Sequence, residues 1–286
     1  MTHELTYRVA RKQGKLAIGR WVGAFVLTVV SVLVMLPFIW MILTSFKTYK
    51  ETVKIPITWL PSTLYWPNYQ NLLTKMNFGQ YYINTILMTV GITIPQLFLS
   101  AMAAYAFARL NFPGKNVIFL VLMAALMIPM QMVLLPRFLL MSCFHWVDSY
   151  KAIIIPEIAS IYGTFFIRQQ FMTLPRELDE SAELDGCSPP RVFWAILLPL
   201  CTSTLVAMGM LTIVYAWNSF LWPLINLNTP NKYVLTIGIA NLKGQYSTKY
   251  DILCTASVLG TVPLLIIFAF GQRYFLEGIA TAGLKA

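Results

Sequence analysis

Charged residues are scarce in this sequence. Only 11% of the 286 residues are Asp, Glu, Lys or Arg, whereas soluble domains contain about 25%. Hydrophobic residues make up 58% of the chain, and the mean hydropathy is +0.66. This composition excludes an ordinary soluble domain and predicts an integral membrane protein built from helices.

Residues that commonly hold metals or form disulfides are also few. The chain has two His and four Cys, and Cys143, Cys187, Cys201 and Cys254 have neither zinc-ligand spacing nor the spacing of a disulfide framework. No arrangement of side chains indicates a nucleophile or a redox centre. We therefore predict no catalytic residue and no metal site.

Long apolar runs indicate where the chain crosses the membrane. A helix needs about 20 apolar residues to cross the bilayer, and six runs in this chain approach that length. The predicted spans are about 21–44, 82–107, 117–136, 152–168, 192–215 and 253–271. The predicted fold class is thus an all-α integral membrane protein with one transmembrane domain over 21–286.

The charges that are present lie mainly in tails and loops. The net charge is +10, and anionic lipid headgroups explain it more simply than nucleic acid does. The arm at 1–20 is basic and precedes the first span. The basic residues beside the first span usually decide which side of the membrane faces the cytoplasm. We expect this arm, the C-terminus and the loop at about 169–191 to lie in the cytoplasm.

A polar, acidic segment at 180–186 interrupts the apolar pattern, with the sequence Glu-Ser-Ala-Glu-Leu-Asp-Gly. Pro175 suits the start of a helix, and Gly186 suits the left-handed residue that ends one. Ser188, followed by two prolines, suits the beginning of the next helix. The pattern predicts a short surface helix between the fourth and fifth spans. On physics alone it is equally a solvated connector or a docking site.

The spacing of this segment resembles a motif of permease subunits of binding-protein-dependent ATP-binding-cassette importers. That motif reads Glu-Ala-Ala, three residues, Gly, nine residues, Ile-x-Leu-Pro. Here it runs from Glu180 to Pro199, with Ser181 where the family most often has Ala. Further motifs resemble the six-span, maltose-type sugar importers: Ser45-Phe46-Lys47, Ala103-Ala104-Tyr105-Ala106, Met127-Ile128-Pro129, Trp217-Asn218 and Gly283-Leu284-Lys285.

The resemblance implies a type I importer permease that is not itself an enzyme. Its implied partners are a second permease, two ATPase subunits and an extracytoplasmic solute-binding protein. The ATPases would hold ATP and Mg, and this chain would bind no cofactor; it contains no phosphate-binding loop. The motif would couple to the ATPases through Glu180, Ser181, Ala182, Asp185, Gly186 and Pro199. The tail at about 272–286 would contact them through Gly283, Leu284 and Lys285. Such importers lie in the bacterial or archaeal cytoplasmic membrane.

Residues along the solute pathway are harder to assign. An acid within a membrane segment suggests a functional site, although Glu157 also fits the outer interface. Amide side chains can bind sugar hydroxyls, and indole rings can stack on sugars, but both also serve in helix contacts and interfacial anchors. The candidates are Asn84, Gln131, Glu157, Trp217 and Asn218.

Three alternatives to a neutral-sugar importer remain open. Basic residues in the outward loops would also suit an anionic or phosphorylated sugar. A stand-alone secondary transporter would usually show internal repeats and mid-membrane charges, and this chain offers few. In a non-transporting scaffold, the acidic motif would be only a docking site.

Overall fold

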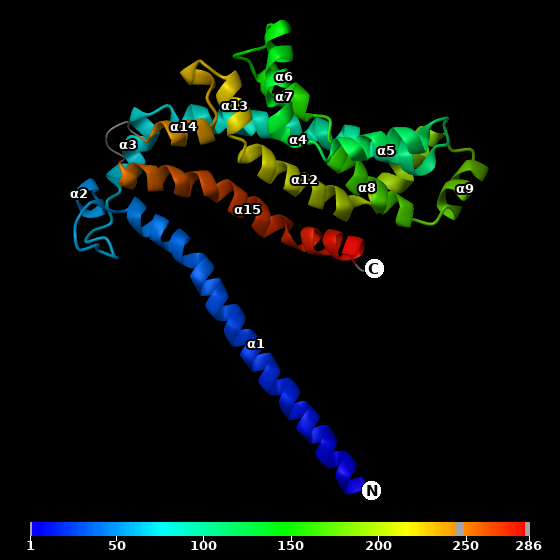
Figure 1. Cartoon of the computed structure of the whole chain (residues 1–286), viewed down its shortest axis with the longest axis horizontal. Helices are drawn as coiled ribbons and strands as arrows, with labels where there is room; N and C mark the ends of the chain where they lie inside the picture. The colour runs from blue at the N-terminus through cyan, green and yellow to red at the C-terminus, as the bar shows by residue number, and fades with distance from the viewer. Residues whose placement is uncertain (1, 244–248, 284–286) are drawn as a thin grey trace. The chain divides into compact units, whose positions relative to one another are not determined.

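The computed structural model describes residues 2–243 and 249–283, with side chains for 20–74, 76–243 and 249–273. The regular elements in these ranges are helices (Figure 1). The longer ones are α1 (Thr2–Ser45), α3 (Pro67–Lys75), α4 (Phe78–Arg109), α5 (Lys115–Ala125), α6 (Met130–Cys143), α8 (Ile161–Thr173), α9 (Glu177–Leu184), α12 (Thr202–Trp217), α14 (Leu235–Asn241) and α15 (Tyr250–Gly283). Shorter elements are α2 (Tyr49–Thr52), α7 (Tyr150–Ile154), η1 (Ile155–Glu157), α10 (Pro189–Val192), η2 (Phe193–Leu197), α11 (Leu198–Leu200), α13 (Leu221–Asn226) and η3 (Pro230–Lys232).

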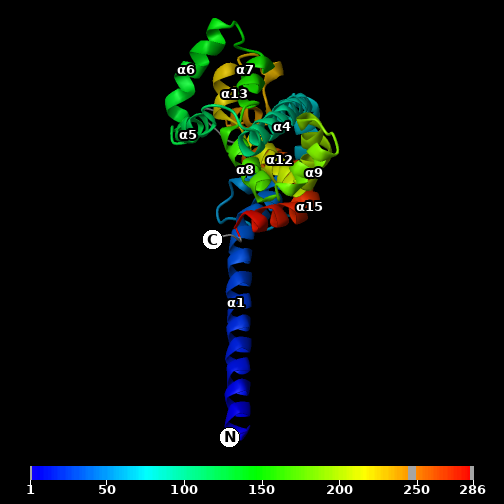
Figure 2. The same cartoon turned by 90° about the vertical axis from the view of Figure 1, so that its right-hand side faces the viewer.

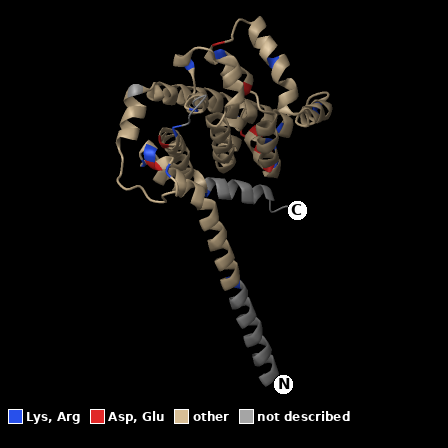
Figure 3. Ribbon diagram, turned by 60° about the vertical axis from the view of Figure 1, so that its left-hand side comes forward, with Lys and Arg blue, Asp and Glu red and all other residues tan. Residues whose placement is uncertain are grey.

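All six predicted spans correspond to helices in the structure. Among the described residues, four helical stretches are long and apolar enough to cross a membrane: Arg20–Ser45, Phe78–Arg109, Tyr150–Thr173 and Tyr250–Arg273. Two bent pairs, α5 with α6 and α10–α11 with α12, bring the number to six if each pair is one span. In Figure 3, most of the described part of the ribbon is tan, the colour of residues that are neither acidic nor basic.

The bends coincide with prolines. The axes of α5 and α6 differ by 101°, and Pro129 stands at the junction as the N-cap of α6. Figure 2 shows the chain turning sharply between these two helices. The helix at Pro189–Leu200 meets α12 at 78°. There, η2 is a π-helical turn, and Pro199, two residues beyond its end, has no N–H to donate along the helix. Both features are common causes of kinks.

The chain forms two compact units, Met1–Leu72 with Gly244–Val258, and Leu73–Lys243 with Leu259–Ala286. In the first, the end of α1 is tied to the following loop. The Asn68 amide donates to the carbonyls of Ser45 and Lys47 at 2.9 and 2.8 Å. The Lys47 ammonium donates to the Thr58 carbonyl at 2.6 Å and lies 4.1 Å from the Trp40 ring centre.

The core of the second unit is the packing of α4 against α8 and α12, which run alongside one another in Figure 1. Small residues allow this close approach: a Cβ at Gly163 of α8 would lie 2.7 Å from the Ser100 hydroxyl of α4. Ala101 and Ala104 of α4 are buried. Interfaces of small residues are typical of packed membrane helices. The cavity described below is lined in part by these helices, and α9 is attached to the end of α4.

Candidate coupling helix and membrane cavity

The acidic segment forms the predicted surface helix, α9, and ends as predicted. Gly186 has φ of +79°, in the left-handed region. Its N–H donates to the Glu183 carbonyl at 3.0 Å, and the Cys187 N–H donates to the Ala182 carbonyl at 2.9 Å. These two bonds form a Schellman motif. Ser188 then caps α10 with an extended backbone, although its side chain makes no capping bond.

The two sides of α9 differ in character. Ala182 is only 5% exposed and belongs to an apolar cluster with Ala108, Phe171 and Val192. The small side chain therefore lets α9 approach its own chain, whereas the resemblance implied that Ala182 contacts the ATPases. Leu184 is 89% exposed. The other exposed side chains of the segment are those of Glu177, Glu180, Ser181, Glu183 and Asp185.

Polar contacts attach α9 and α10 to the end of α4. Arg109 Nε lies 3.3 Å from Asp179 Oδ2, and Arg109 Nη2 donates to the Leu174 carbonyl at 3.0 Å. The Tyr105 hydroxyl donates to the Pro189 carbonyl at 3.2 Å. The Arg109 side chain is 7% exposed and that of Asp179 is 19% exposed, so this ion pair is largely shielded from water. It fixes α9 relative to α4.

A cavity of about 550 Å³ lies among the spans of the second unit. The residues that line it are Gln96, Leu126, Ile128, Met130, Val133, Arg137, Pro156, Glu157, Ala159, Ser160, Ile161, Tyr162, Met208, Leu211, Thr212 and Tyr215. They come from α4, the break between α5 and α6, α6 itself, η1 and the residues after it, the start of α8, and α12. Most of the lining is apolar, with polar groups gathered around Glu157.

The Glu157 carboxylate is held by two partners. Arg137 Nη2 donates to Oε1 at 2.6 Å, and the Tyr215 hydroxyl donates to Oε2 at 3.2 Å. Gln96 donates to the Glu157 backbone carbonyl at 2.7 Å and accepts from the Thr212 hydroxyl at 2.8 Å. The Arg137 guanidinium also lies over the Trp222 ring, 4.3 Å from its centre. These bonds hold Glu157 in a fixed position relative to α4, α6 and α12.

Comparison with known proteins identifies the family. Residues 96–280 match the family model described as binding-protein-dependent transport system inner membrane component. The arabinooligosaccharides transport system permease protein AraQ of Halalkalibacterium halodurans is 36% identical, over 93% of this chain and 96% of that one. The chain belongs to this family.

A second relative supports the assignment of this permease, and a solved structure shares its fold. The sn-glycerol-3-phosphate transport system permease protein UgpE of Pectobacterium atrosepticum is 32% identical over 80% of the permease and 85% of its own length. A crystal structure of a bacterial transporter that imports the acidic polysaccharide alginate superposes with a TM-score of 0.82 at 20% identity, covering 90% of the permease and 96% of that chain. At this identity the structure shows the fold alone.

Of the predicted pathway residues, only Glu157 lines the cavity of the permease. Asn84 is buried and donates to the backbone carbonyls of Asn231 and Tyr233, both at 2.8 Å. The Trp217 indole donates to the Gly260 carbonyl at 2.9 Å. Asn218 donates to the Val214 carbonyl at 2.8 Å and caps α12. Those three residues make internal contacts.

Gln131 is exposed on α6 and does not line the cavity. The sequence does not predict Arg137 as a site residue. The third predicted span ends at 136, which leaves Arg137 in the loop that follows it. The structure continues α6 to Cys143, so Arg137 lies within a helix. A basic residue inside an otherwise apolar run was the available signal.

The remaining predicted residues lie elsewhere in the permease. Pro199 is exposed in α11, at the kink before α12. Gly283 is the last residue of α15, and Leu284 and Lys285 lie outside the described residues.

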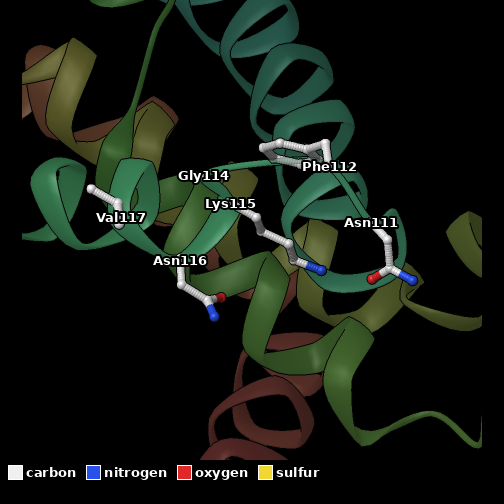
Figure 4. A pocket seen from close by; sticks show the side chains of 6 residues that line it. All are labelled: Asn111, Phe112, Gly114, Lys115, Asn116 and Val117. Atoms are coloured by element: carbon white, nitrogen blue, oxygen red, sulfur yellow. The ribbon is translucent and has the colours of Figure 1, made fainter.

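A further hollow, of about 450 Å³, adjoins the loop between α4 and α5 (Figure 4). Lys115 there donates to the Leu110 carbonyl at 2.7 Å.

Proposed function

We propose that this permease is the membrane subunit of an ATP-binding-cassette importer for a sugar or oligosaccharide. The observation that carries the proposal is the geometry of α9, with Ala182 buried in its own chain and Leu184 exposed among acids. A helix anchored on one side and presenting an apolar residue with charges on the other is suited to docking. The AraQ relative, similar over nearly its full length, supports the sugar as solute.

In this function, α9 docks onto an ATPase subunit. Leu184 enters an apolar part of the ATPase surface, and Glu180 and Asp185 make charge-assisted contacts with it. Ser181 lies on the same exposed side. Ala182 and Gly186 shape the helix and its end, and Pro199 sets the kink into α12. The C-terminal residues Gly283, Leu284 and Lys285 add further ATPase contacts.

The permease itself does no chemistry in this proposal. ATP and Mg bind to the two ATPase subunits, and this chain binds no cofactor. A second permease completes the pathway, and an extracytoplasmic binding protein delivers the solute. The basic N-terminal arm at 1–20, the motif helix and the C-terminus lie on the cytoplasmic side, and residues 21–286 form the transmembrane domain.

An anionic sugar is the second candidate solute, because the UgpE relative transports sn-glycerol 3-phosphate by name. A stand-alone secondary transporter is disfavoured by membership of a family of binding-protein-dependent systems. A scaffold without transport is disfavoured by the same membership.

Purification in gentle detergent tests the proposal. We expect the tagged permease to bring along an ATP-binding-cassette ATPase and a second permease. In proteoliposomes, this complex with its binding protein should take up solute only when ATP is supplied. Uptake by the permease alone, without ATP, would contradict the proposal and make a secondary transporter the working assignment.

A further inference from the structure

We infer that the cavity around Arg137 and Glu157 is a solute site selective for an uncharged saccharide. This inference rests on the proposed importer function and adds the substrate class and the residues of this chain that recognise it. Neither the motif helix nor the similarity to known permeases assigns a solute site to these residues.

The position of the cavity suits a transported solute. Gln96 lies midway along α4, and Met208 to Tyr215 lie in the middle and second half of α12. Another wall is the break between α5 and α6 at Leu126 to Met130. Transporters commonly place their solute sites near the bilayer midplane, where interrupted helices leave polar groups available. The volume also falls within the range of about 300–1,000 Å³ typical of small-molecule sites.

The ion pair between Arg137 and Glu157 lies in the wall of this cavity. Charged side chains within a membrane segment are costly and usually mark a pathway or site. The side chains of Arg137 and Glu157 are 19% and 12% exposed, so both reach the cavity surface. A purely structural link between α6 and η1 would be served as well by apolar packing. The bonds from Tyr215 and Gln96 hold the pair in place, which favours recognition of a ligand of defined shape.

The charge of the cluster selects against anions. Among the described residues that line the cavity, the single cation is paired with the single anion at 2.6 Å. An anionic solute that captured Arg137 would leave the largely buried Glu157 carboxylate charged and without its partner, which is strongly unfavourable. Hydroxyl groups can instead donate to the carboxylate and accept from free guanidinium N–H groups while the pair stays intact.

Aromatic rings complete the match to a saccharide. The side chains of Tyr162 and Tyr215 are 47% and 46% exposed and line the same cavity. Tyr162 also stacks on Phe166, with ring centres 6.0 Å apart, which fixes its orientation. Rigid aromatic faces beside charged hydrogen-bonding groups suit a ligand with both C–H faces and hydroxyl edges.

The test uses the complete importer in proteoliposomes, with its binding protein at saturation. The probes are arabinotriose and N,N′-diacetylchitobiose, which are uncharged, and sn-glycerol 3-phosphate, which is anionic. We expect ATP-driven uptake of an uncharged probe and none of the phosphate. Uptake of the phosphate in preference to both saccharides would overturn the inference while leaving the importer function intact. Absence of any ATP-dependent uptake would remove the importer function and this inference together.

Variants then locate the site. Glu157→Gln and Tyr162→Ala should each lower saccharide uptake per ATP hydrolysed by about tenfold, with assembly checked in parallel by co-purification of the ATPase. Tyr162→Phe keeps the ring and should retain uptake. Lys151→Gln, which removes an exposed cation outside the cavity, is the matched control for loss of charge. If Glu157→Gln fails to assemble, Tyr162→Ala decides the matter. Normal uptake per ATP by Tyr162→Ala would overturn the inference.

Discussion

Nε of Arg109 lies 3.3 Å from Oδ2 of Asp179, and this contact joins the last residue of α4 to the motif helix α9. Both side chains are largely shielded from water. Because α4 also packs along α8 and α12, this contact connects α9 to the core of the second unit. The ion pair is thus the polar part of the link between α9, the proposed docking helix, and α4.

Breaking this link should uncouple the importer. In Asp179→Asn, the guanidinium loses its charged partner at a shielded site, which weakens the attachment of α9 by about 1–3 kcal/mol. We expect solute uptake per ATP hydrolysed to fall several-fold while the complex still assembles. The measurement is uptake and ATPase rate in the same proteoliposomes.

Two comparisons make that result specific. Glu177→Gln removes an exposed acid from the same helix and should leave the ratio of uptake to hydrolysis near the wild-type value. The exchanged pair Arg109→Asp with Asp179→Arg should recover part of the loss. An unchanged ratio in Asp179→Asn would show that α9 is held by apolar packing alone.

Ala182 and Leu184 lie two residues apart on opposite sides of α9, so substitutions there should separate stability from docking. Ala182→Leu forces a larger side chain into the packed cluster and should destabilise the permease by about 1–3 kcal/mol. Leu184→Ser removes an exposed apolar residue and should leave the unfolding temperature unchanged. It should instead reduce the amount of ATPase that co-purifies. Full ATPase recovery with Leu184→Ser would place the docking contact elsewhere.

The end of α9 gives a test of backbone conformation. Gly186 has φ of +79°, and a Cβ added there would meet no atom within 4 Å, so any penalty arises from the backbone alone. A left-handed conformation costs an ordinary residue about 1–2 kcal/mol. Gly186→Val should therefore disturb the turn into α10 and lower transport, whereas Gly186→Asn, which tolerates this conformation, should retain more of it. Equal transport by the two variants would contradict this account.

The helices could be predicted from the sequence because both signals, apolar runs and the residues that begin or end a helix, are local. Helices lie at all six predicted apolar runs, and the acids, Pro175 and Gly186 correctly predicted α9 and its end. The 101° bend between α5 and α6 was not predicted. A proline such as Pro129 permits a kink, but the packing around it determines the angle.

The cavity could not be predicted, because it depends on contacts between distant segments. Arg137 and Glu157 are 20 residues apart, and Tyr215 comes from α12. Hydropathy does not show which helices adjoin. The same limit explains why Asn84 and Trp217 were considered as solute ligands: only the structure shows their hydrogen bonds to backbone carbonyls. Ala182 was interpreted as a contact for a partner because the pattern alone does not tell which side of α9 is covered.

Asp148 fastens the loop after α6 to the loop after α13. Its Oδ1 accepts from the N–H groups of Asn228 and Thr229 at 2.9 and 3.0 Å. Its Oδ2 accepts from Lys232 Nζ at 2.8 Å. Burial alone would raise the pKa of Asp148, but these bonds outweigh it and hold the pKa well below its ordinary value. The folded state therefore keeps this carboxyl ionised at pH values where the unfolded chain takes up a proton.

This difference in pKa predicts how the permease responds to acid. The stabilisation from Asp148 is fully present above the pKa of an unfolded Asp, about 3.9, and is lost as the pH falls from there towards the lower folded pKa. Asp148→Asn should lower the unfolding temperature of the detergent-solubilised permease at pH 7. The gap between variant and wild type should narrow only below about pH 4. Lys151→Gln, which changes an exposed charge nearby in the chain, is the control and should show no such gap. A gap that instead closed between pH 7 and pH 5 would mean that a group with a higher pKa, and not this carboxylate, holds the two loops together.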